Sequence, residues 1–217
     1  MKALLSTTYF GPVQWYQKLY RSEETEIEAC ENFQKQTFRN RCVIATTQGT
    51  QALTFPVVRS DNSTIKDIRI SDHGNWRHLH WNALQSAYGE SPFFEYYQDD
   101  IRPFFEKKWE FLLDFNEEIR LKICELIDIE PKVRLTDEFR TESLEFKDYR
   151  SVINPKHPME DPTSSPSLTI RYTNKNTASC QISLSSTCFS TWVLRAFSFY
   201  NNRKKHREHQ YSKDYRK

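Results

Sequence analysis

The chain has 217 residues, of which 37% are hydrophobic and 14% aromatic, so it can build one domain with an aromatic-rich core. Its formal net charge of +2 at pH 7 is close to balance and implies no particular partner, and no nucleic acid is predicted because only the basic C-terminal run would favour it. The mean hydropathy of −0.78 is low for a fully compact protein and indicates that part of the chain does not contribute to a core.

The cysteines and the apolar runs bear on the compartment. The five cysteines form no CxxC pair, which argues against a zinc ribbon or a disulfide scaffold and fits a reducing environment. The apolar stretch near the start is too short for a signal peptide, and no run approaches the ~20 residues that span a bilayer. We therefore expect a cytoplasmic protein without a membrane span.

The first part of the chain alternates strand and helix patterns. Residues 3–7 form an apolar run typical of a buried strand, and Pro12 suits the first position of the helix that follows. The alternation over residues 25–30 predicts a half-buried strand. Because ligands often bind where a strand passes into a helix, Tyr9, Pro12 and Gln14 are candidate substrate-binding residues.

The next part of the chain predicts a β-hairpin. Two strand-like runs, 41–45 and 51–58, are separated by a loop of about five residues that contains Gly49. Pro56 interrupts the second run and places it at a sheet edge or a bulge. Residues 65–70 predict a further strand.

The segment from Asp67 to Phe94 joins this strand-rich half to a helical half. It holds three of the six histidines, and residues 76–88 predict a helix that ends at Gly89. The apolar side of this helix is expected to carry Trp76, Leu79, Ala83 and Ala87. Histidines two residues apart on a helix point about 200° apart and cannot share an ion, so no metal site is predicted.

Helical spacing resumes at Tyr97 and continues to Ile127, with Pro103 marking a kink or a new start. Serine, threonine and basic residues dominate from residue 162 onward. The expected fold class is α/β, a domain over residues 1–161 with a small mixed β-sheet from the N-terminal half and packed helices. Residues 162–217 are expected to form an irregular C-terminal tail.

The glycines and the cysteines bear on cofactor binding and on nucleophilic catalysis. The four glycines are isolated, so no P-loop or dinucleotide fingerprint is present and no cofactor is predicted. A cysteine nucleophile would require Cys30 or Cys42 to meet a histidine, although buried cysteines on strands are commonly packing residues.

A basic group is the stronger signal for ligand binding, and it could hold a phosphate or a carboxylate. The alternative is a solvated face paired with the glutamates of residues 23–28. Aromatic side chains nearby could stack on a ligand or simply build the core. The basic group consists of Lys35, Arg39, Arg41, Arg69 and Arg77.

Five motifs follow one another along the chain: LLSTTYFGPVQWYQKLY, ENFQKQTFRNRCVI, ALTFPV, IKDIRISDHGNWRHLHWNALQSAYGESPFFEYY and FEKKWEFLLDFNEEIRLKICELI. In this order they make residues 4–161 resemble the WbqC-like protein family. It implies an α/β bacterial protein, often encoded among O-antigen biosynthesis genes, for which transfer reactions, including aminoacyl transfer to sugars, have been suggested. It supplies no established catalytic residues.

The C-terminal part departs from this family. Such proteins usually end in a Gly-Phe-x-Pro-Asn-Leu-Ser and Asp-Leu-Leu-Phe-Asn pattern, which is missing here. Back-translating residues 164–200 and reading them one nucleotide out of register yields that ending with a suitable choice of codons. We therefore expect a frameshift near residues 161–163, in the gene or in its sequencing.

These observations lead to one functional hypothesis and two alternatives. The first is a transferase of surface-polysaccharide biosynthesis with an anionic substrate, in which His80 is a possible general base. The alternatives are a non-catalytic sugar- or nucleotide-binding or assembly protein, and an inactive truncated product. Convergence of His80 with the arginines favours an enzyme, whereas a buried His80 favours binding. The substrate-binding residues would be Tyr9, Pro12, Gln14, Arg39, Asn40, Arg41, Trp76 and Arg77.

Overall fold

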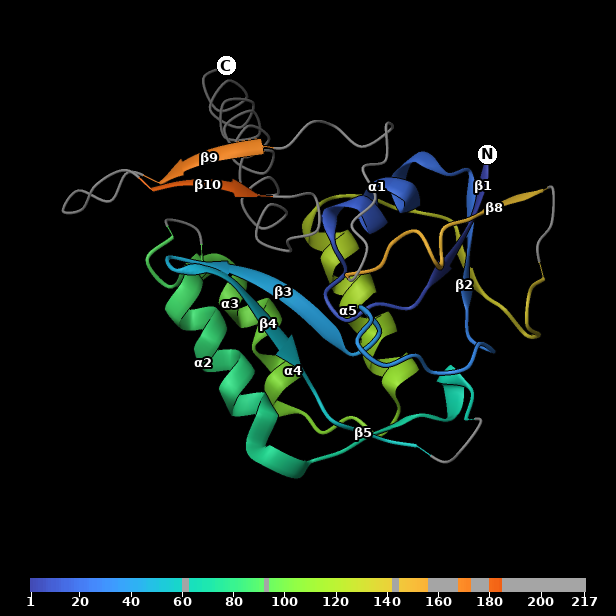
Figure 1. Cartoon of the computed structure of the whole chain (residues 1–217), viewed down its shortest axis with the longest axis horizontal. Coiled ribbons are helices and arrows are strands. Elements are labelled where there is room, and N and C mark those ends of the chain that lie inside the picture. Colours follow the sequence, from blue (N-terminus) through green and yellow to red (C-terminus); the bar gives the residue numbers. More distant parts are fainter. Residues whose placement is uncertain (60–62, 92–93, 142–144, 156–167, 173–179, 185–217) are drawn as a thin grey trace, which may run out of the picture.

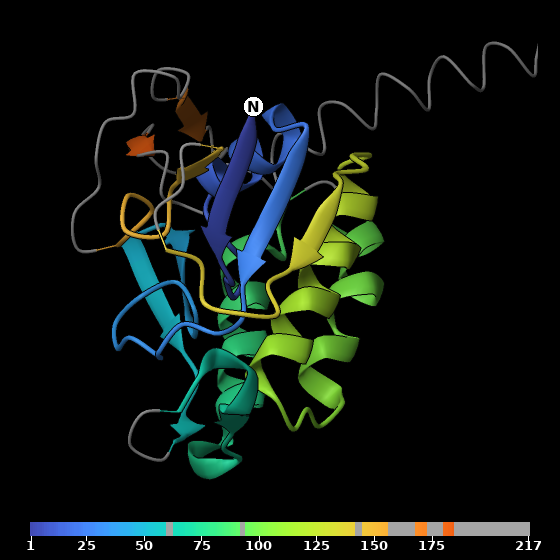
Figure 2. The same ribbon diagram turned by 90° about the vertical axis from the view of Figure 1, so that its right-hand side faces the viewer.

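A four-stranded parallel sheet lies at one end of the molecule (Figures 1 and 2). The computed structural model describes residues 1–59, 63–91, 94–141, 145–155, 168–172 and 180–184. The strands stand in the order β7-β2-β1-β8. Their bounds are β1 (Lys2–Ser6), β2 (Glu24–Glu28), β7 (Val133–Leu135) and β8 (Phe146–Asp148).

The two central strands are covered on both faces. Ala3 to Ser6 in β1 and Thr25 to Glu28 in β2 are all buried, as is usual where helices and loops flank a parallel sheet. The connection between them is α1 (Val13–Arg21), which begins directly after Pro12. The α/β class expected from the sequence is confirmed.

Antiparallel ribbons form a second part of the fold. The hairpin joins β3 (Arg41–Thr46) to β4 (Gly49–Thr54) across two residues rather than about five. Pro56 ends this ladder, and β5 (Val57–Val58) then pairs with β6 (Arg69–Ile70). Residues 65–70 were expected to be one strand, but Ile65–Asp67 form a 3-10 turn before β6.

Helices pack beside the hairpin and behind the sheet (Figures 1 and 2). They are α2 (Trp76–Tyr88), α3 (Phe94–Ile101), α4 (Pro103–Glu106) and α5 (Leu112–Leu126). The bounds predicted for α2 are confirmed, and its predicted apolar side is correct in part, because Trp76 is buried and Ala83 and Ala87 pack partly against the core. The buried residues are Trp76, His80, Leu84 and Tyr88, whereas Leu79 is 59% exposed.

Aromatic rings join these elements into one core. The Tyr9 ring lies 4.8 Å from that of Phe55 and 5.7 Å from that of Phe115. Trp76 in turn lies 5.1 Å from Phe55. These contacts bring the end of β1 and its following loop against α2 and α5, although the residues are far apart in the sequence.

Two short strands lie within residues 162–217, where the sequence predicts an irregular tail. They are β9 (Leu168–Tyr172) and β10 (Cys180–Leu184), and they pair antiparallel. The rest of that expectation falls outside the described residues.

Candidate functional site

A cleft opens between the β-hairpin and the N-terminal half of α2. Its cavity volume is about 690 Å³, within the range of small-molecule sites. We call it the hairpin cleft. Its lining includes Phe33, Lys35, Gln36, Asn40, Arg41, Thr54, Val57, Arg59, His73, Trp76, Leu79 and His80.

Basic side chains dominate the charge of the hairpin cleft. Lys35 and Arg59 are exposed at the cleft, and Arg41 is half-buried within it. The Arg41 Nε atom is buried and has no hydrogen-bond partner among the described residues. Aspartate and glutamate are absent from the described lining. The cleft is therefore electropositive and suited to an anionic group.

The hairpin holds Arg41 in place through its neighbour Asn40. The Asn40 Nδ2 atom donates to the Phe55 carbonyl oxygen at 2.8 Å, and the Phe55 N–H donates to the Asn40 carbonyl oxygen at 3.2 Å. Arg41 itself is paired with Thr54 in the ladder. These hydrogen bonds hold the Arg41 backbone within the hairpin, so its side chain extends from a rigid element rather than from a loop.

Helix α2 contributes Trp76 and His80, four residues apart on its buried stripe. The Trp76 Nε1–H donates to the Ser71 carbonyl oxygen at 2.9 Å. The N-terminus of α2 has no side-chain cap, because Asn75 adopts a left-handed conformation with φ 48°. Neither Asn75 nor Asp72 makes a side-chain capping hydrogen bond at this end of the helix.

His80 is buried and uncharged. Its side chain is 5% exposed, and burial lowers its pKa from 6.5 to about 4 despite a backbone hydrogen bond with Thr54. Burial also raises the pKa of the Tyr9 hydroxyl well above 10.0, so this group stays protonated. The Tyr9 hydroxyl lies 2.9 Å from His80 Nδ1, and because the imidazole N–H bonds the Thr54 backbone, the tautomer that follows makes Nδ1 the acceptor from Tyr9.

The structure brings some of the predicted site residues together. Asn40, Arg41, Trp76 and His80 all line the hairpin cleft. Tyr9 is not among the lining residues, but it contacts His80 through its hydroxyl and Phe55 through its ring, and both of these residues line the cleft.

Other predicted site residues lie elsewhere. Arg39 is buried in an ion pair with Glu31 and also donates to Ser6 Oγ at 2.9 Å. Pro12 and Gln14 are buried at the start of α1 and are not among the residues lining the cleft. The basic group proposed from the sequence is thus dispersed, because Lys35 and Arg41 line the cleft, Arg39 is interior, and Arg69 forms an exposed ion pair with Glu110.

Arg77 faces a different cavity, on the other side of the first turn of α2. That cavity has a volume of about 460 Å³ and also contains Arg102 and Lys108. The Arg77 guanidinium stacks on the Trp76 ring at 4.6 Å and donates to Asp72. Its carboxylate partner makes Arg77 less available to an anion than Arg41.

Two cleft residues, Arg59 and His73, were not singled out from the sequence as substrate ligands. Arg59 follows the second hairpin run, and His73 precedes α2. No local pattern links these two residues, because they come to line the same cleft only when β5 pairs with β6 in the folded chain. A basic residue directly after an expected edge strand is the one signal that could have pointed to Arg59.

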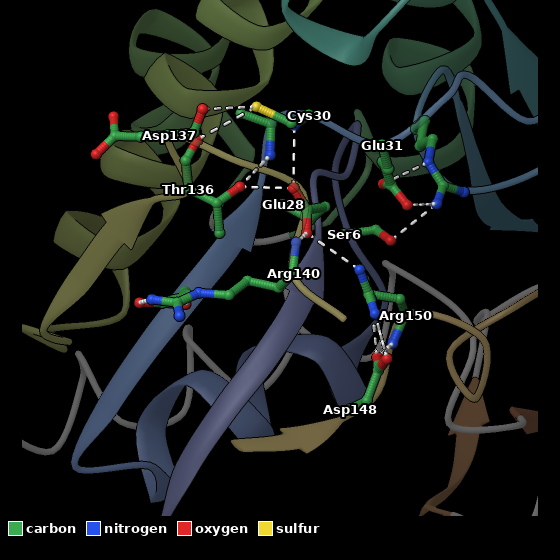
Figure 3. Close-up of polar contacts among 12 residues, drawn as sticks. Ser6, Glu28, Cys30, Glu31, Thr136, Asp137, Arg140, Asp148 and Arg150 are labelled. Carbon is green, nitrogen blue, oxygen red and sulfur yellow. Dashed lines mark hydrogen bonds and ion pairs between the residues drawn. The ribbon is translucent and has the colours of Figure 1, made fainter. Parts of the chain in front are cut away.

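A charge network occupies the carboxyl edge of the sheet (Figure 3). The chain moves from β1 to β2 on one side, and β8 pairs on the other, so the strand order reverses between β1 and β8. Ligands of α/β folds commonly bind at this reversal point. Here Arg150 donates to both Glu28 and Asp148. The adjoining cavity has a volume of only about 10 Å³.

Sequence comparison adds the family. Residues 7–156, more than half of the chain, match the sequence model of the WbqC-like protein family. The chain belongs to the WbqC-like protein family. No curated protein and no solved structure matches it significantly. The matched region of this WbqC-like protein includes the whole hairpin cleft.

The described part of this WbqC-like protein contains neither a membrane-spanning helix nor a cluster of metal ligands. No helix there is long and apolar enough to cross a membrane. Within the same residues, no group of three or more histidine, cysteine or acidic side chains is placed to hold a metal ion. His73 and His78 are exposed, and His78 bonds Asn82 at 2.9 Å rather than joining His80.

Proposed function

We propose that this WbqC-like protein binds an anionic substrate in the hairpin cleft and acts as a transferase in surface-polysaccharide (O-antigen) biosynthesis. The substrate would be a sugar or an aminoacyl compound that carries a phosphate or a carboxylate. The observation that carries this proposal is the basic lining of the cleft around Arg41, without a carboxylate in its described part. The pathway and the reaction class rest on the family resemblance.

Each cleft residue has a distinct role in this proposal. Arg41 holds the anion through its guanidinium, and Lys35 and Arg59 attract the ligand from the rim. Trp76 closes the inner wall. His80 is the candidate general base, and as a neutral imidazole at pH 7 it can accept a proton once Nδ1 leaves the Tyr9 hydroxyl.

A second candidate function is binding without catalysis. The burial of His80 favours it, because both Tyr9 and Thr54 hold the imidazole and a group with a pKa of about 4 is a weak base at pH 7. The protein would then carry or sense an anionic sugar or nucleotide.

Anion binding is tested by titrating the full chain with inorganic pyrophosphate in a calorimeter. We expect Arg41→Ala to weaken binding ten- to a hundredfold, because a hydrogen bond to a charged group contributes about 1.5–3 kcal/mol. Arg134→Ala, an exposed arginine of β7 outside the cleft, is the matched control and should bind as the wild type does. Equal affinity of Arg41→Ala and wild type would refute the proposal.

Catalysis is tested separately, by mass spectrometry of products after incubation with nucleotide sugars and aminoacyl donors. A transferase gives product with the wild type, and His80→Gln lowers turnover more than it lowers pyrophosphate affinity. Ligand binding without any product supports the second candidate instead.

A further inference from the structure

Aliphatic side chains lie beside the basic lining of the hairpin cleft. Leu79 of α2 lines the cleft and is 59% exposed. Val57 of β5 also lines the cleft and is half-buried, whereas its exposed neighbour Val58 is not among the lining residues. A single exposed apolar residue needs no explanation, but aliphatic side chains from two separate elements that line one cleft indicate an apolar contact.

The apolar surface of the cleft is aliphatic rather than aromatic. Trp76 is 3% exposed, and its ring is covered by Phe55 at 5.1 Å and by the Arg77 guanidinium at 4.6 Å. Phe33 lines the cleft but is partly buried against the core. A nucleobase or another flat ring would therefore find only this partly covered aromatic face to stack on, whereas an alkyl chain can lie along Leu79 and Val57.

Charge and apolar surface together define the ligand class. We propose that the hairpin cleft binds a phosphate that carries an aliphatic chain. The phosphate lies against Arg41 and Lys35, and the chain lies over Leu79 and Val57. This inference rests on the proposed anion site and adds the chemistry attached to the anion. The same chemistry is found in a free alkyl phosphate and in an anionic lipid headgroup.

The test compares inorganic phosphate with octyl phosphate, titrated calorimetrically below the micellar concentration of the latter. We expect octyl phosphate to bind the wild-type chain at least tenfold more tightly. Leu79→Ser should reduce this ratio to less than threefold. Because Leu79 is exposed, this substitution removes no core packing. Leu121→Ser, at a 52% exposed leucine of α5, is the matched control and should keep the full ratio.

The outcomes separate this inference from the proposed function. Equal affinity for octyl and inorganic phosphate overturns the aliphatic contact while the anion site stands. A ratio that is unchanged in Leu79→Ser overturns it as well. If neither phosphate binds, the anion site itself fails.

A vesicle experiment distinguishes the two sources of the ligand. The chain is co-sedimented with vesicles of phosphatidylglycerol and, separately, of phosphatidylcholine. Selective binding to phosphatidylglycerol that is lost in both Arg41→Ala and Leu79→Ser supports a lipid headgroup. Tight octyl phosphate binding without vesicle binding supports a free alkyl phosphate.

Discussion

At the scale of single residues, His80 makes stability depend on pH. Its pKa is lowered from 6.5 to about 4 by burial, so the unfolded chain takes up this proton first as the pH falls. With respect to this group, the free energy of unfolding is therefore highest above pH 6.5 and falls as the pH is lowered from 6.5 to 4. Since one pKa unit corresponds to about 1.4 kcal/mol, we expect a loss of about 3 kcal/mol across this window.

Urea unfolding at several pH values checks this prediction. His80→Gln should have a lower free energy of unfolding at pH 7 but a flatter dependence between pH 4 and 6.5. His78→Gln, an exposed histidine of the same helix, should follow the wild-type curve. A wild-type slope retained in His80→Gln would contradict the assignment.

Tyr9 is expected to stabilise the fold through its hydroxyl group. Tyr9→Phe removes the donor to His80 Nδ1 and leaves a buried acceptor without a partner, which costs about 1–3 kcal/mol. Chemical denaturation at pH 7 measures the difference. Tyr20→Phe, at a tyrosine that is 71% exposed, should change the free energy of unfolding by less than about 0.5 kcal/mol.

Residue type alone predicted only part of the cleft. Arg41 and Trp76 were singled out as an arginine and an aromatic beside expected element ends, and both line the cleft. Arg39 has the same chemistry two positions earlier, but Glu31 neutralises it in the interior. Two residues that are two apart in a strand would share a side, but Arg39 lies before β3, and the tertiary fold brings Glu31 and Ser6 to it.

At the scale of elements, one carboxylate at the end of β2 binds the segments that follow β7 and β8. Glu28 ends β2 and is fully buried. It accepts hydrogen bonds from Thr136 Oγ1 after β7 (2.6 Å), the Arg140 backbone N–H (2.9 Å) and Arg150 Nη1 after β8 (3.0 Å) (Figure 3). Its partners therefore fix the carboxyl edge of the parallel sheet.

Neutralising this carboxylate should destabilise the sheet. Glu28→Gln leaves Arg150 with one carboxylate fewer in a buried setting, and we expect a loss of about 3 kcal/mol in the free energy of unfolding. Glu24→Gln, on the same strand but in a partly exposed pair with Lys2, should cost at most about 1 kcal/mol. Equal effects of the two substitutions, measured by urea denaturation, would show that the network is not a stabilising element.

The elements themselves were easier to predict than their faces. The apolar spacing and the terminal Gly89 located α2 correctly, yet its buried side is the stripe of Trp76, His80, Leu84 and Tyr88. Histidine and tyrosine are poor indicators of burial on their own. They are buried here because Tyr9 pairs with His80 and the Tyr88 hydroxyl accepts from the Ala45 N–H at 3.2 Å, contacts that depend on the tertiary fold.

At the scale of the whole molecule, the space for a ligand lies at the hairpin cleft and not at the sheet edge where α/β folds commonly bind ligands. The reversal point between β1 and β8 is filled by buried ion pairs and leaves a cavity of about 10 Å³. The space for a ligand lies instead against the hairpin, with a cavity of about 690 Å³. The parallel sheet therefore serves mainly as a scaffold that holds Tyr9, and through it His80, behind the cleft.

The chain beyond residue 161 differs in character from the part that matches the family. The family match stops at residue 156, close to where serine, threonine and basic residues begin to dominate. We predict that residues from about 162 onward are read out of frame and that the restored frame supplies the apolar helix pattern of the family ending. Each side chain that this helix buries should contribute about 1.5–3 kcal/mol, so the frame-restored chain should have a clearly higher free energy of unfolding.

Resequencing the gene around codons 161–163, followed by urea unfolding of both versions, tests this prediction. A chain cut after residue 161 is the control, because a segment that was never selected to pack should add nothing to stability. The 217-residue chain and the cut chain should therefore unfold at the same urea concentration, and the restored chain at a higher one. An unbroken reading frame, or a cut chain less stable than the 217-residue chain, would show that residues 162–217 belong to the fold.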